Sequence, residues 1–64
     1  MAWLCVDEDG SEWLSIKRVK RVFDFIEKGY WVSDQLQGIV KLKKGTIELL
    51  LGRKLTWADE AVKI

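Results

Sequence analysis

The sequence contains no histidine, no proline and a single cysteine among its 64 residues. Without histidine, the chain cannot pair a serine nucleophile with an imidazole base, and the common zinc-ligand sets cannot form. The ten acidic residues are scattered among predicted turns and show no matched catalytic pair. The sequence therefore predicts a protein that is not an enzyme and that carries no metal or other cofactor.

Long hydrophobic runs are also missing, because no unbroken apolar stretch approaches the roughly 20 residues of a membrane helix. We therefore expect no membrane association. Cys5 cannot form an internal disulfide, which is typical of a cytoplasmic protein, and its apolar neighbours predict a buried side chain. Eleven basic and ten acidic residues give a net charge of +1, too balanced to indicate a nucleic-acid partner from bulk charge alone.

A chain this short forms one domain, residues 1–64, and buries only about 60% of the surface that its unfolded form exposes. Large side chains must therefore supply much of its core. The sequence has four tryptophans, which we expect in the core: Trp3, Trp13, Trp31 and Trp57. The alternative is an exposed aromatic recognition surface, which requires at least two of them side by side and uncovered.

The first sixteen residues have the pattern of a β-hairpin. Two apolar-rich runs, Ala2 to Val6 and Ser11 to Ile16, flank an acidic turn that ends in Gly10. A three-residue turn with a bulge places Cys5 opposite Trp13 and Leu4 opposite Leu14. Both faces of this hairpin carry apolar residues, so each must be covered at least in part. The acidic turn does not have the ligand spacing of a calcium loop.

Residues 16–28 fit two structures, and the sequence does not decide between them. Ile16, Val19, Phe23 and Ile26 follow a helical period, with Ser15 as a possible N-cap and Gly29 as a stop. However, cations crowd the first turns, where the helix dipole disfavours them, and the β-branched and aromatic residues suit a strand equally well.

After Gly29, the segments Tyr30 to Val32 and Ile39 to Leu42 have strand composition, and the turn-forming run Ser33 to Gly38 separates them. We expect these two strands to pair as a second hairpin. Thr46 is then placed to cap a short helix that Gly52 ends. Such a short helix needs anchoring on the sheet, and the predicted anchors are Ile47, Leu50 and Leu51.

The tail, Leu55 to Ile64, also has two interpretations. Thr56 and Asp59 resemble a helix-capping pair, whereas the alternation from Ala58 to Ile64 fits a strand. Taken together, these signals predict an α+β domain: a small, mostly antiparallel sheet of four to five strands with one or two short helices packed on it.

Two segments resemble small uncharacterised proteins of bacterial and phage genomes. They are the opening Trp3–Gly10, WLCVDEDG, and the run from Leu42 through Trp57 with Asp59 and Glu60, which contains KGTIE and LGRKLTW. The resemblance covers about half the chain and leaves residues 17–40 outside it. It implies an extended tail and a phage or mobile-element origin, and it implies no activity.

A basic cluster beside several aromatic residues is the strongest functional signal in the sequence. We interpret the chain as a non-enzymatic protein-interaction module, with an unknown protein partner or a second copy of itself as the target. The alternative is a weak nucleic-acid-binding domain that uses the cluster at 17–21, where cations grip phosphates and aromatic rings stack on bases. The candidate binding residues are Lys17, Arg18, Lys20, Arg21, Phe25, Tyr30 and Trp31.

Overall fold

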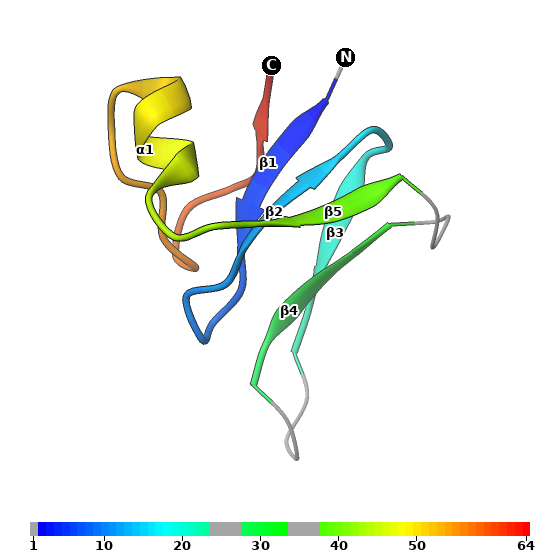
Figure 1. The fold of residues 1–64 in the computed structure, drawn as a ribbon. Helices are drawn as coiled ribbons and strands as arrows, with labels where there is room; N and C mark the ends of the chain where they lie inside the picture. Colours follow the sequence, from blue (N-terminus) through cyan, green and yellow to red (C-terminus); the bar gives the residue numbers. More distant parts are fainter. Residues whose placement is uncertain (1, 24–27, 34–37) are drawn as a thin grey trace.

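The computed structural model describes residues 2–23, 28–33 and 38–64 (Figure 1). These residues form two antiparallel sheets and a short helix, which confirms the predicted α+β class. In chain order the elements are β1 (Trp3–Val6), β2 (Glu12–Ser15), β3 (Val19–Val22), β4 (Tyr30–Ser33), β5 (Ile39–Leu42), α1 (Thr46–Leu51) and β6 (Val62–Lys63).

The larger sheet has the strand order β5-β2-β1-β6, and β3 and β4 form the second sheet. The predicted first hairpin is confirmed with its register, because Leu4 pairs with Leu14 and Cys5 pairs with Trp13. Gly10, with φ of 90°, supplies the left-handed residue of the turn. This hairpin formed as predicted because its turn and its strand pattern are both local properties of the sequence.

The segment after the first hairpin is a strand from Val19 to Val22, so the helical interpretation of this region is wrong. Ser15 does not cap a helix. Its buried hydroxyl donates to the carbonyl of Lys17 at 2.7 Å and shapes the turn into β3. Pairing with β4 buries Val19, and tertiary contact therefore outweighs the helical period. Residues 24–27, near the end of the segment 16–28 that this interpretation covered, lie outside the described residues.

The predicted second hairpin is also wrong, although both of its strands exist. β4 pairs with β3, whereas β5 pairs with β2 and extends the larger sheet. The reason lies in the two cores. On β5, Leu42 packs with the aliphatic core under α1, while on β4 Trp31 packs into an aromatic core on the other side of the larger sheet.

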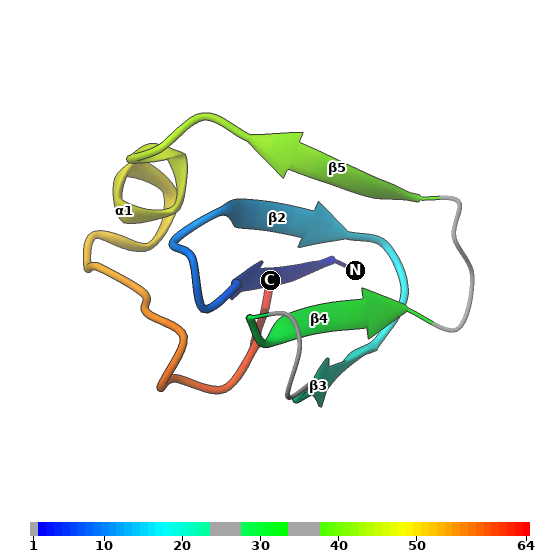
Figure 2. The ribbon, with the colours of Figure 1, turned by 90° about the horizontal axis from the view of Figure 1, so that it is seen from below.

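The central strand β1 contributes to both cores, since successive side chains of a strand point to opposite faces. Leu4 and Val6 face the aliphatic core, which α1 covers. Cys5 faces the aromatic core, which the β3–β4 pair covers (Figure 2). Trp31 is buried, and the other three tryptophans, Trp3, Trp13 and Trp57, are half-buried and pack around that core. The prediction that both hairpin faces are covered is therefore confirmed.

Helix α1 begins and ends close to the predicted positions, but its cap differs. The cap residue is Gly45 with φ of 93°, and the Thr46 hydroxyl instead donates to the carbonyl of Lys43 at 2.7 Å. The Glu12 carboxylate accepts the backbone N–H groups of Gly45 and Ile47 at 2.7 and 2.9 Å. A carboxylate from a distant strand therefore accepts backbone N–H groups at the helix N-terminus, where negative charge is favoured.

Two of the three predicted helix anchors are confirmed. Ile47 is 1% exposed, and Leu51 packs against the aliphatic core. Leu50 is 57% exposed and is therefore no anchor, which corrects the prediction. The helix is too short for its sequence period to decide which of several consecutive leucines meets the sheet.

The C-terminal tail is extended at its end and turned at its start, so the helical interpretation is wrong. Thr56 and Asp59 do interact as a pair, with the Thr56 N–H donating to the Asp59 carboxylate at 2.8 Å. The Asp59 N–H in turn donates to the Thr56 carbonyl at 3.0 Å and closes a turn. Val62 then pairs with Leu4 on β1. In the described part of the chain, no helix is long and apolar enough to cross a membrane.

Cys5 is completely buried, as predicted, and burial raises the pKa of its thiol from 9.0 to about 12. Between these values the folded state binds more protons than the unfolded state, so stability falls as pH rises. We expect the free energy of unfolding of the wild-type protein to drop relative to that of Cys5→Ala by about 1.4 kcal/mol per pH unit above pH 9. Urea denaturation of both proteins between pH 8 and 10.5 measures this difference. Parallel pH profiles would contradict the burial of the thiol.

Candidate functional site

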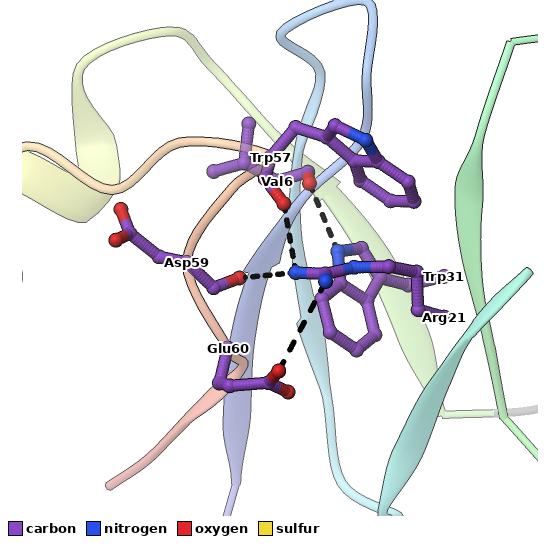
Figure 3. Close-up of polar contacts among 6 residues, drawn as sticks. All are labelled: Val6, Arg21, Trp31, Trp57, Asp59 and Glu60. Carbon is purple, nitrogen blue, oxygen red and sulfur yellow. Dashed lines mark hydrogen bonds and ion pairs between the residues drawn. The ribbon is translucent and has the colours of Figure 1, made fainter.

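Arg21, the last residue of the predicted basic cluster, lies against two tryptophan rings, those of Trp31 and Trp57 (Figure 3). Its guanidinium carbon is 4.8 Å from the ring centroid of Trp31 and 4.7 Å from that of Trp57. Its Nη2 donates to the carbonyls of Trp57 and Asp59, both at 2.8 Å. Arg21 therefore ties β3 to the loop before β6, and its charge is already engaged within the domain.

Trp31 belongs to the same arrangement and is 7% exposed. Its indole Nε1 donates to the carbonyl of Val6 at 2.9 Å, and its ring meets that of Trp57 edge to face at 5.9 Å. A side chain on Gly29 would lie only 2.3 Å from the Trp57 ring, so this glycine permits the close packing. Arg21 and Trp31, two of the predicted binding residues, therefore lie opposite each other in the β3–β4 pair. The Trp31 indole joins this pair to β1, and the contacts with Trp57 join it to the loop before β6.

The remaining cations of the predicted cluster do not join Arg21. Lys20 neighbours it on β3, where alternation directs the two side chains to opposite faces, and Lys17 is exposed in the turn before β3. Arg18 instead lies 6.0 Å from the ring centroid of Trp3, where Lys63 also lies at 5.9 Å. No sequence signal indicated Lys63, because β6 brings it to this ring from the far end of the chain. Phe25 lies outside the described residues.

Tyr30 and Trp31, the other predicted site residues, line a groove of about 340 Å³ between β4 and β5. We call this feature the aromatic groove. β4 contributes one wall, β5 contributes Ile39, and Trp13 on β2 lies between them. The complete lining is Asp7, Trp13, Tyr30, Trp31, Val32, Ser33 and Ile39. Most of these residues are apolar or aromatic, which is the character of sites that bind ligands or partner side chains.

Asp7 is the charged residue in this lining. Its Oδ2 accepts the indole N–H of Trp13 at 2.9 Å, and its Oδ1 accepts the backbone N–H of Trp31 at 3.0 Å. Partial burial raises the pKa of the Asp7 carboxyl, and the two hydrogen bonds oppose this rise. The sequence placed Asp7 in the acidic turn of the first hairpin and did not indicate a site there. Only the position of β4 beside that turn makes it part of the groove.

A larger hollow of about 670 Å³ lies between the acidic turn and the start of α1. Its charged residues include Glu8 and Glu12. Both carboxylates are occupied by backbone groups, because Glu12 binds the helix N-terminus and Glu8 accepts the N–H of Gly29 at 2.7 Å. Among the residues that the structure describes, no group of three or more metal-ligating side chains is arranged around one point. The aromatic groove is the better candidate site, because its lining is mostly apolar or aromatic and includes two of the predicted binding residues, Tyr30 and Trp31.

Comparisons with protein-family models, with curated proteins and with solved structures found no match to this chain.

Proposed function

We propose that this domain is a non-enzymatic protein-interaction module that holds a segment of a partner protein in the aromatic groove. The observation that carries the proposal is an open, largely apolar groove along β4, the strand that pairs with β3 in the smaller sheet. Two residues singled out from the sequence, Tyr30 and Trp31, line it. Aromatic residues are enriched in protein interfaces and contribute much of their binding energy.

The resemblance to phage and bacterial proteins suggests a host protein as the target. A second copy of the chain, paired through the edge of the larger sheet, is a less suitable partner than another protein. β5 is an edge strand of the larger sheet, and pairing two β5 strands would bring Lys41 and Lys43 of both copies to one seam. Lysine on an edge strand disfavours such pairing.

The test is a pull-down from bacterial lysate with tagged wild-type protein, a groove variant and a matched surface variant. Tyr30→Ala truncates a side chain of the groove lining, whereas Leu49→Ala changes a helix residue that is 87% exposed and is not part of that lining. We expect a stoichiometric protein that survives nuclease and high salt, is retained by Leu49→Ala and is lost with Tyr30→Ala. Equal recovery by both variants would contradict binding through the groove.

The second candidate function is weak nucleic-acid binding, and the observation that favours it is the convergence of Arg18 and Lys63 on Trp3. Phosphate contacts of this kind weaken steeply with salt. Arg18→Glu is the suitable variant, because Arg21→Glu would also remove the contacts of Arg21 with the Trp31 and Trp57 rings. Recovery of nucleic acid that is lost at high salt and with Arg18→Glu would favour this function over the first.

A further inference from the structure

We propose that the aromatic groove recognises a cationic side chain, lysine or arginine, of the partner protein. This inference rests on the proposed function and specifies the chemistry of what the groove holds. Three features of the groove support it: a carboxylate without a cation in contact, aromatic rings beside that carboxylate, and a cation of the domain itself already placed against one of these rings.

The carboxylate is that of Asp7. Its two hydrogen-bond partners, the Trp13 indole and the Trp31 amide, are neutral groups. In residues 2–23, 28–33 and 38–64, the ion pair within 4.0 Å joins Arg21 to Glu60, and none involves Asp7. A partly buried carboxylate with no cation within 4.0 Å among the described residues favours a ligand of opposite charge, because that ligand offsets the cost of desolvation.

The aromatic part of the groove suits the same ligand. Trp13 and Tyr30 line it together with Asp7, and the faces of such rings attract ammonium and guanidinium groups. Aliphatic stems of lysine and arginine can at the same time pack on Ile39 and Val32, which complete the apolar part of the lining. The lining therefore complements both the stem and the head of a long cationic side chain.

Lys41 shows that a cation is accommodated at this ring. Its ammonium lies 5.9 Å from the ring centroid of Trp13, and its charge lowers the pKa of the nearby Asp7 carboxyl. Lys41 is exposed and lies outside the groove lining. It therefore attracts Asp7 from the rim and repels an incoming cation. Removing its charge should strengthen binding of a cationic ligand, whereas it should not strengthen binding of a neutral one.

The experiment is an NMR titration of the full ¹⁵N-labelled chain at low salt with three five-residue peptides, blocked at both ends. They carry lysine, arginine or norleucine at the centre of four alanines. The readout is the Trp13 indole N–H resonance, which reports on the hydrogen bond to Asp7. We expect the lysine and arginine peptides to bind at least about tenfold more tightly than the norleucine peptide.

Two variants complete the test. Asp7→Asn should remove most of the preference for the cationic peptides, and Lys41→Gln should strengthen their binding about two- to threefold by removing a like charge. If Asp7→Asn does not fold, Lys41→Gln alone decides, because Lys41 is exposed. Equal binding of the norleucine peptide, or no shift of the Trp13 resonance with any peptide, overturns the inference. The proposed function would still stand if the pull-down shows loss of the partner with Tyr30→Ala.

Discussion

Replacing Ile47 with alanine is expected to lower the free energy of unfolding by about 2 to 5 kcal/mol, the range for a large core residue whose removal leaves a cavity. Ile47 is 1% exposed and packs in the aliphatic core with Leu4, Val6 and Leu55. In a domain of 64 residues this is a large share of the total stability. Urea denaturation followed by tryptophan fluorescence measures the loss.

Leu50→Ala is the matched control, since it also shortens an aliphatic side chain of α1. Leu50 is 57% exposed, so we expect a change within about 0.5 kcal/mol. The sequence assigned both residues the same anchoring role, and the structure separates them. A loss for Leu50→Ala as large as that for Ile47→Ala would show that a different face of the helix meets the sheet.

Replacing Arg21 with alanine is expected to lower the free energy of unfolding by about 2 to 4 kcal/mol, although the sequence indicated Arg21 only as part of a candidate binding cluster. The change removes two hydrogen bonds to the carbonyls of Trp57 and Asp59 and the contacts of the guanidinium with two indole rings. Its side chain is 33% exposed, so the pair with the exposed Glu60, at 3.9 Å, adds little. Chemical denaturation again measures the effect.

Two further variants separate this contact from simple loss of charge. Lys20→Ala removes a neighbouring cation on the same strand, and we expect a change within about 0.5 kcal/mol because Lys20 is exposed. Arg21→Lys keeps the charge but not the planar fork that serves both carbonyls, so it should recover only part of the loss. Full recovery with lysine would mean that charge alone explains the effect.

The prediction for Arg21 also bears on the choice of variants for functional tests. If Arg21 stabilises the fold as its contacts indicate, substitutions there cannot be used to test nucleic-acid binding, because loss of binding would follow from loss of structure. Arg18 is better suited to that purpose, since its contact in the structure is with the half-buried Trp3 ring at 6.0 Å. Lys41→Gln avoids the same difficulty, because Lys41 is exposed.

The sequence by itself determined the elements whose signals are local. The acidic turn with Gly10 and the alternation on either side specified the first hairpin and its register. The Lys-Gly-Thr start and Gly52 specified the short helix from Thr46 to Leu51, because glycine readily adopts the left-handed conformation found at both of its ends. The buried thiol of Cys5 followed from its place in an apolar strand.

Tertiary structure alone decided the rest, since strand pairing depends on contacts between residues far apart in the chain. The segment around Val19 carries a helical period, and it becomes a strand because β4 offers a partner and an aromatic core. As a strand, this segment sends Arg21 to Trp57 and directs Lys20 to the opposite face, and its partner β4 brings Trp31 to Asp7. The aromatic groove exists only because β4 and β5, close in sequence, join different sheets.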